Sequence, residues 1–276
     1  MKIAQVFHGN RRILGAVQEN KLLPFESHDS LSAIMEANGT PRVGKEDPLD
    51  LEEIRWAPVV QRPGKIIAIG LNYRDHAAES KGKLPDFPLI FAKFPSSLAG
   101  HKDEITWDQR ITRKVDFEAE LAVVIGKKVR NCPETEALHA VFGYTCANDV
   151  SARDLQFGDG QWVRGKSLDT FCPLGPWLVT RDEIPDPLDL AIRCRVNGEL
   201  MQDNRTAEMI FSVPRLISLL SQHFTLFPGD IILSGTPAGV GAFREPPVYL
   251  KDGDEVAVEI DAIGRLVNTC HAVETR

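Results

Sequence analysis

The stretch VDFEAELAVVIG, residues 115–126, combines the composition of a buried strand with three acidic side chains. Alternate residues of a strand share a face, so Asp116, Glu118 and Glu120 are predicted to project to one side. The other side carries the apolar residues Val115, Phe117, Ala119, Leu121 and Val123. Three neighbouring negative charges repel one another, so a cation or solvent has to lie beside them.

From about residue 65 the chain alternates short β-rich runs with turn signals. The strongest strand candidates are KIIAIG (65–70), LIFAK (89–93), LAVVIG (121–126), LAIRCRV (190–196), DIILSG (230–235), EVAVEI (255–260) and RLVNTC (265–270). The segments NGE (197–199) and AIG (262–264) are predicted to form hairpin turns. This pattern of many strands and few helices predicts a β-rich α+β fold.

Helices are expected at only a few places, including residues 133–142 and 212–224. In the second of these, Ser212 is the expected N-cap and Pro214 lies in the first turn. Residues 1–60 read as a small unit that starts with a β-hairpin, so the predicted domains are 1–60 and 61–276.

Composition excludes several classes of function. The chain has 276 residues, 43% of them hydrophobic, and a net charge of −7 without a block of Lys or Arg, which argues against nucleic acid as a partner. Its five cysteines are scattered without a CxxC pair, as in a reduced protein. We expect no signal peptide and no membrane segment, and therefore a cytoplasmic location.

The acidic face of the 115–126 strand is a candidate metal site. Glu118 and Glu120 can reach one point, and Asp149 at the end of the run GYTCAND could supply a third carboxylate. Three carboxylates suit Mg²⁺, Mn²⁺ or Ca²⁺ rather than Zn²⁺. The alternative is a solvated strand face, and Asp116 is not counted as a ligand.

A second cluster, GLNYRDHAAES (70–80), directly follows a predicted strand. If this segment is helical, His76 and Glu79 lie three residues apart on one face. A carboxylate beside an imidazole orients the ring and raises its basicity, which makes a general base. The alternative is a surface histidine in a local ion pair.

Two loops offer further polar groups. Lys166 in GKSLDTFCPLGP (165–176) could stabilise an oxyanion or could be a solvated charge. The glycine-rich segment SGTPAGVG (234–241) could hold a substrate carboxylate with its backbone N–H groups and Thr236, or could be a plain connection.

These motifs together, in this order along the chain, resemble the fumarylacetoacetate hydrolase family. The resemblance covers roughly residues 62–262 and is closest to the shorter members: acylpyruvases, fumarylpyruvate hydrolases and hydroxyheptadienedioate isomerases. The motifs that carry it are GLNYRDHAAE, FPSSLAG, DFEAELAVVIG, NDVSARDLQ, GKSLDTFCPLGP, NGE and LSGTPAGVG.

The resemblance implies a mixed β-sandwich roll with a small N-terminal domain, and a homodimer. It places the metal ligands on Glu118, Glu120 and Asp149, with Mg²⁺ or Mn²⁺ as the cofactor. The catalytic positions it implies are His76, Glu79 and Lys166. The substrate-binding positions it implies are Arg153, Gln156 and Thr236. His101 departs from the pattern, because relatives often have a proline there, and the short N-terminal unit argues against fumarylacetoacetate itself as the substrate.

The expected reaction is metal-dependent hydrolysis of a C–C bond in a β-diketo acid, such as an acylpyruvate, fumarylpyruvate or a 2,4-diketo sugar acid. His76, oriented by Glu79, would activate water, Lys166 would stabilise the oxyanion, and the metal would hold the departing pyruvate as its enolate. Decarboxylation of oxaloacetate and isomerisation of 2-hydroxyhepta-2,4-diene-1,7-dioate use the same site and stay open as alternatives. A non-catalytic, metal-stabilised binding protein is disfavoured, because binding alone needs no base.

Overall fold

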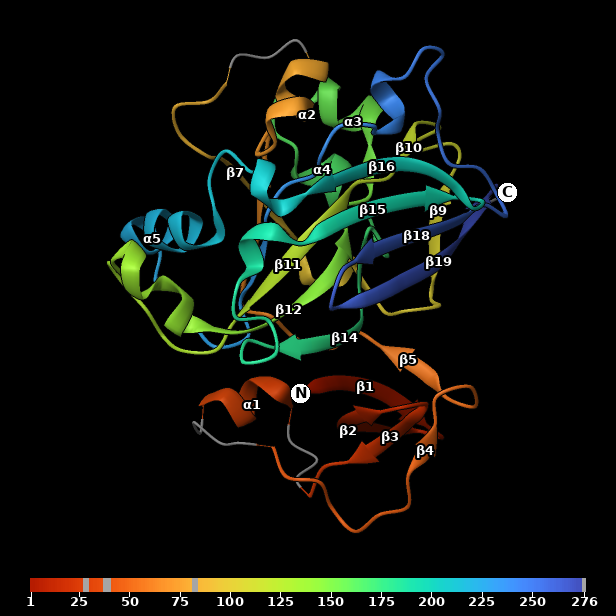
Figure 1. The fold of residues 1–276 in the computed structure, drawn as a ribbon. Helices are drawn as coiled ribbons and strands as arrows, with labels where there is room; N and C mark the ends of the chain where they lie inside the picture. The colour runs from red at the N-terminus through yellow and green to blue at the C-terminus, as the bar shows by residue number, and fades with distance from the viewer. Residues whose placement is uncertain (27–29, 37–40, 81–83, 275–276) are drawn as a thin grey trace.

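The computed structural model describes residues 1–26, 30–36, 41–80 and 84–274, and it shows a strand-rich body built from two large sheets and one two-stranded sheet (Figure 1). The main path of the larger sheet is β4 (Leu49–Asp50), β3 (Lys21–Pro24), β2 (Arg11–Gln18), β1 (Lys2–His8), β14 (Cys172–Thr180), β12 (Val141–Asn148), β11 (Ala119–Ile125), β17 (Ile231–Leu233), β6 (Ile66–Gly70) and β7 (Leu89–Lys93). Two short strands join it at the side, β5 (Arg55–Ala57) on β1 and β8 (Leu98–Ala99) on β14.

The smaller sheet lies against the larger one and carries the C-terminal part of the chain. Its order is β16 (Glu199–Arg205), β15 (Ala191–Val196), β18 (Glu255–Ile260), β19 (Gly264–Val273) and β9 (Glu104–Asp108). A two-stranded pair consists of β10 (Val115–Asp116) and β13 (Ser151–Ala152). The helices are α1 (Leu31–Glu36), α2 (Arg74–Glu79), α3 (Arg153–Gly158), α4 (Val163–Lys166) and α5 (Val213–His223). The expected β-rich α+β class is confirmed.

Strand β11 is buried on both faces, which explains its continuous apolar run. Leu121 and Val123 belong to the main hydrophobic core, which also contains residues of the smaller sheet such as Val258. Ala122 and Val124, on the opposite face, pack into a second core with residues of β6 and β14. Glu118 and Glu120 therefore lie on the same strand face as Ala122 and Val124, and the rest of that face is apolar.

Local signals predicted several boundaries correctly. The turns at 197–199 and 262–264 join β15 to β16 and β18 to β19, as expected. Helix α5 starts after Ser212, whose hydroxyl accepts a hydrogen bond from the backbone N–H of Arg215.

Two expectations about secondary structure were wrong in part. The helix expected over 133–142 is a 3₁₀ helix over Glu134–Ala140, and β12 starts at Val141. The strand expected over 115–126 is interrupted at residues 117–118, where the chain passes from β10 to β11.

The N-terminal unit is joined to the main body by backbone pairing, because β1 pairs antiparallel with β14. The division at residue 60 stays a prediction. Among the described residues, no helix is long and apolar enough to cross a membrane.

Candidate active site

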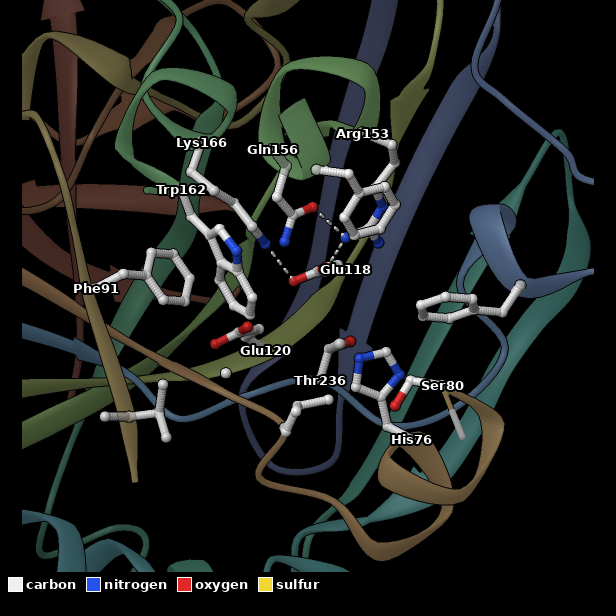
Figure 2. Close-up of a pocket in the computed structure, with 15 residues that line it drawn as sticks. His76, Ser80, Phe91, Glu118, Glu120, Arg153, Gln156, Trp162, Lys166 and Thr236 are labelled. Carbon is white, nitrogen blue, oxygen red and sulfur yellow. Dashed lines mark hydrogen bonds and ion pairs between the residues drawn. The ribbon is translucent and has the colours of Figure 1, made fainter. Parts of the chain in front are cut away.

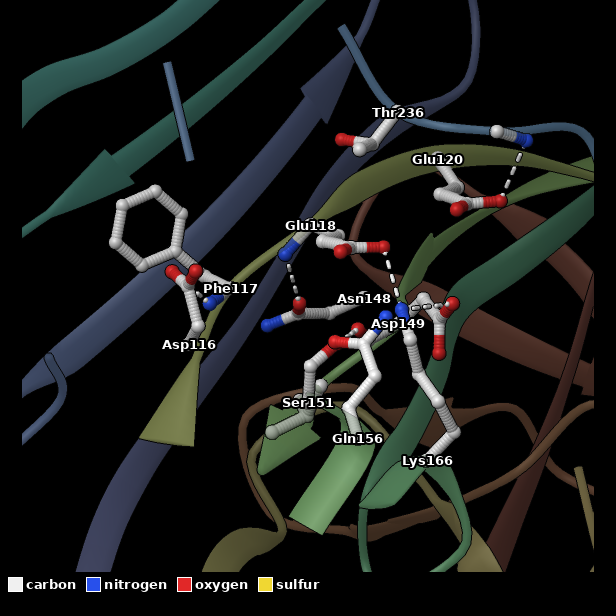
Figure 3. A network of polar contacts seen from close by, with 12 residues as sticks. Asp116, Phe117, Glu118, Glu120, Asn148, Asp149, Ser151, Gln156, Lys166 and Thr236 are labelled. Carbon is white, nitrogen blue, oxygen red and sulfur yellow. Dashed lines mark hydrogen bonds and ion pairs between the residues drawn. The ribbon is translucent and has the colours of Figure 1, made fainter. Parts of the chain in front are cut away.

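One strand register brings the acidic residues together. β10 pairs with β13, and β11 pairs with β12 in the same register, so Glu118 lies across from Asp149. The backbone confirms this arrangement: the N–H of Asp149 donates to the carbonyl of Glu118 at 2.9 Å, and the N–H of Glu118 donates to Oδ1 of Asn148 at 2.9 Å. Because Glu120 follows Glu118 on the same strand face, the three carboxylates converge (Figure 3).

The three carboxylates form a compact buried cluster. Each of Glu118, Glu120 and Asp149 offers an oxygen, and these oxygens lie within 4.8 Å of one another. Lys166 donates to Glu118 Oε2 at 2.7 Å and to Asp149 Oδ2 at 2.8 Å. Arg153 Nη1 lies 2.7 Å from Glu118 Oε1. Lys93 also binds Asp149, at 2.6 Å, so three cations partly neutralise the cluster.

The electrostatics of the cluster disfavour the charged form of Glu120. Burial raises the pKa of Glu118, but the charges of Lys166 and Arg153 outweigh burial and hold this pKa at about 2. Burial and the charges of Asp149 and Glu118 raise the pKa of Glu120 well above its usual range. Burial favours the neutral amine of Lys166, but Asp149 and Glu118 outweigh it and raise the pKa, so this side chain stays an ammonium. A further cation would stabilise the ionised Glu120, and three carboxylate oxygens are a ligand set that suits Mg²⁺ or Mn²⁺.

The helix expected after β6 forms as α2 and brings His76 and Glu79 together. Nδ1 of His76 lies 3.3 Å from Oε1 of Glu79. Because an ionised carboxylate can only accept, this contact places a proton on Nδ1, and in the neutral ring the lone pair is then on Nε2. The helix is tied down at both ends, by Asn204 donating to Asp75 Oδ2 at 2.6 Å and by the N–H of Gly239 donating to Glu79 Oε2 at 2.6 Å.

The glycine-rich loop after β17 donates backbone hydrogen bonds to two of the protein's own carboxylates. The N–H of Gly235 donates to Glu120 Oε2 at 2.7 Å, and Gly239 holds Glu79. Gly235 has φ of +99°, and a Cβ there would lie 2.6 Å from Cβ of Asn72, so only glycine fits. The amides of Gly235 and Gly239 are therefore occupied by the protein's own carboxylates. Thr236 remains available, because its Oγ1 accepts from Gln202 and its own O–H is left to donate.

A cavity of about 300 Å³ gathers most of the predicted site residues (Figure 2). The predicted residues that line it are His76, Glu118, Glu120, Arg153, Gln156, Lys166 and Thr236. Asp149 and Glu79 do not line the cavity themselves. Asp149 binds Lys166, and Glu79 binds His76. The rest of the lining is largely apolar and includes Ile69, Leu71, Phe91, Phe157, Trp162 and Phe243.

Arg153 has one guanidinium nitrogen without a hydrogen-bond partner in the part of the chain that the structure describes. Its Nε donates to Asp116 Oδ2 at 2.8 Å. Its Nη1 binds Glu118 Oε1 at 2.7 Å and donates to Gln156 Oε1 at 2.9 Å. Nη2 is buried and has no hydrogen-bond partner among the described residues. Because Nη2 is buried, a substrate carboxylate could reach it from the cavity only if neighbouring side chains shift, and such a contact would satisfy this donor.

Sequence reasoning missed two charged residues of the site. Asp116 was left unassigned, but it is fully buried, binds Arg153 and accepts the backbone N–H groups of Gly241 and Ala242 at 2.7 and 2.9 Å. Lys93 was read only as the end of an apolar strand, but its ammonium is buried against Asp149 at 2.6 Å. The available signal was a charged residue closing an otherwise apolar strand, LIFAK.

His101, which had no role from the sequence, lies at the junction with the N-terminal unit. Its Nδ1 accepts the N–H of Val267 at 3.0 Å, and its ring meets Trp56 edge-on with centroids 4.9 Å apart. Burial, with smaller effects of Lys102 and Arg265, lowers its pKa to about 4, so the ring is neutral.

The chain is similar to several known proteins. Residues 65–271 match a family model described as the fumarylacetoacetate (FAA) hydrolase C-terminal domain. The mitochondrial oxaloacetate tautomerase FAHD2B of Bos taurus is 50% identical over 222 residues, which is 80% of this chain and 70% of that protein. Among solved structures, a fumarylacetoacetate hydrolase from Exiguobacterium antarcticum is 37% identical with a TM-score of 0.89, and covers 99% of this chain and 100% of that one. A 2-hydroxyhepta-2,4-diene-1,7-dioate isomerase from Mycobacterium marinum is 33% identical with a TM-score of 0.84, and covers 100% of both chains.

Proposed function

The chain belongs to the fumarylacetoacetate hydrolase family, and we propose that it catalyses keto–enol tautomerisation of a 2-oxo acid, with oxaloacetate as the first substrate to test. One observation carries the proposal: His76 lines the same cavity as the carboxylates Glu118 and Glu120. A proton-transfer group thus faces a site suited to a divalent ion. The name of the bovine relative favours oxaloacetate over the β-diketo acids expected from the sequence.

Glu118, Glu120 and Asp149 would hold Mg²⁺ or Mn²⁺, which when bound acts as a Lewis acid on the oxygens of the oxo acid. The substrate carboxylate would accept from the free Nη2 of Arg153. Gln156 Oε1 is taken by Arg153, so its amide N–H groups are the part that can donate to a ligand. These contacts orient C3 of the substrate toward His76.

In the keto-to-enol direction, Nε2 of His76 removes a proton from C3. The C–H electron pair becomes the C2=C3 double bond, and the 2-oxygen takes the negative charge beside the Lys166 ammonium. The imidazolium then returns its proton to that oxygen, which completes the enol. Glu79 holds Nδ1–H throughout and stabilises the charged ring. Lys166 acts as a cation and not as a base, since its pKa is raised.

Hydrolysis of an acylpyruvate-type β-diketo acid is the second candidate. It is favoured by the apolar wall of the cavity, in which Phe91 and Trp162 meet edge-on with centroids 5.3 Å apart. A cavity of about 300 Å³ leaves room for an acyl group beside a pyruvate-sized head. In that reaction His76 would deprotonate water instead of C3. Decarboxylation of oxaloacetate, a homodimer and a cytoplasmic location remain predictions, and the compartment in the bovine relative's name belongs to that protein.

The test is the rate at which enol oxaloacetate is consumed, followed by ultraviolet absorbance with Mg²⁺, against Mg²⁺ in buffer alone. Wild type should exceed this background, and His76→Asn should lose about 10²–10⁴-fold in rate. The control is His8→Asn, because His8 is exposed on β1 and should leave the rate unchanged. A His76→Asn variant as fast as wild type would contradict the proposal. Hydrolysis of acylpyruvates without any tautomerisation would select the second candidate.

A further inference from the structure

Lys93, at the end of β7, is a buried lysine that the proposed reaction does not use. Its side chain is 0% exposed. Its ammonium donates to Asp149 Oδ1 at 2.6 Å, to the carbonyl of Val150 at 3.3 Å and to the carbonyl of Lys166. An ammonium has three N–H donors, so all three are used. Burying a charge is costly unless it is paired and fully hydrogen-bonded, and Lys93 meets both conditions.

A direct catalytic role does not fit this arrangement. Lys93 is not among the residues that line the cavity of His76 and Lys166, and it has no donor left for a substrate. Its contacts run instead to the two residues that form the back of the site. It fixes one oxygen of Asp149, and it holds the backbone of Lys166, whose ammonium binds the other oxygen.

The two oxygens of Asp149 therefore bind different lysines. Oδ1 accepts from Lys93, which does not line the cavity, whereas Oδ2 accepts from Lys166, which does. Each oxygen keeps a second lone pair, so an ion in the cavity could share Oδ2 with Lys166, while the Lys93 ammonium holds Oδ1 on the side away from the cavity. Mg²⁺ requires compact octahedral coordination, while Ca²⁺ accepts more oxygens and often binds a carboxylate through both.

We propose that Lys93 is a positioning residue that restricts Asp149 to one-oxygen coordination and thereby selects Mg²⁺ or Mn²⁺ over Ca²⁺. This inference rests on the metal site of the proposed function. Removing the ammonium would free Oδ1 of Asp149 and release the backbone of Lys166. The freed carboxylate could then bind through both oxygens, which favours the larger ion.

The experiment is calorimetric titration of MgCl₂ and CaCl₂ into the wild type and Lys93→Met, without substrate. The wild type should bind Mg²⁺ more tightly than Ca²⁺. In Lys93→Met the ratio of Ca²⁺ to Mg²⁺ affinity should rise about 10-fold, the scale at which groups that support metal ligands act. The control is Lys65→Met, because Lys65 forms a similar pair at 2.6 Å with the buried Asp230 away from the cavity. Its ratio should stay at the wild-type value even if it lowers stability.

The outcomes separate the two proposals. A wild type that binds neither ion overturns both the metal site and the role of Lys93. A wild type that prefers Ca²⁺, or a Lys93→Met variant whose ratio stays within twofold of wild type, overturns the role of Lys93 alone. If Lys93→Met does not fold, Lys93→Leu is titrated in its place, because its side chain also lacks any donor to Oδ1. The same rise in the ratio is expected there, and an unchanged ratio again contradicts the proposal.

Discussion

Replacing Arg153 by lysine tests how the site recognises a substrate carboxylate. The guanidinium binds Asp116 through Nε at 2.8 Å and Glu118 through Nη1 at 2.7 Å, with Nη2 left for a ligand. A lysine ammonium is a single point charge, so it cannot keep both carboxylates and also reach the ligand. A hydrogen bond between charged groups contributes about 1.5–3 kcal/mol, so binding should weaken roughly 10- to 150-fold.

The assay is calorimetric titration with oxalate in saturating Mg²⁺, because oxalate carries the adjacent oxygen pair of a 2-oxo acid. Arg195→Lys is the matched control, since Arg195 is a partly exposed residue of β15 paired with Glu259 at 3.6 Å. Thermal denaturation of both variants separates lost binding from lost folding. If folded Arg153→Lys binds oxalate as tightly as wild type, the free Nη2 is not the carboxylate site.

Three further predictions concern stability and catalysis. His101 has a pKa lowered to about 4 in the folded protein, so its neutral form stabilises the fold above the unfolded pKa of about 6.5. That contribution, up to about 3 kcal/mol, is lost as the pH falls from about 6.5 toward 4. His101→Asn should therefore lose less unfolding free energy than wild type over this pH range, as measured by urea unfolding. The same pH dependence in both proteins would contradict this prediction. Glu79→Gln removes the charge that stabilises the imidazolium of His76, so kcat should fall at least about 10-fold with little change in Tm, whereas an unchanged kcat would refute the pairing. Ser212→Ala removes the cap of α5 and should cost about 1 kcal/mol in unfolding free energy, and no change in urea unfolding would argue against that cap.

Alternation along residues 115–126 was sufficient to predict the common face of Glu118 and Glu120, because side-chain direction in a strand is a local property. The meeting with Asp149 depends on the register of β11 with β12, and the sequence indicated it only through the resemblance. The interruption at residues 117–118 and the burial of Asp116 depend on Arg153 and on the 241–242 amides, which are distant in the chain.

Other features escaped prediction for the same reason. Strand β14 was not identified, because Pro173, Gly175 and Pro176 break its apolar pattern, and it forms through pairing with β12 and β1. Lys93 looked like an ordinary strand end, since the acceptors of its ammonium come from three distant residues. Local periodicity thus predicts elements and faces, while buried charge networks depend on tertiary contacts.

The central claim is that His76 moves a proton at C3 of a 2-oxo acid in a cavity that holds a divalent ion. It is tested most directly by nuclear magnetic resonance of deuterium uptake at C3 of pyruvate in D₂O, because enolisation is common to all the candidate reactions. Wild type with Mg²⁺ should exchange the C3 protons faster than Mg²⁺ alone, and His76→Asn and Glu118→Gln should fall to that background. Exchange in His76→Asn at the wild-type rate, or no exchange above background by the wild type, would contradict the account.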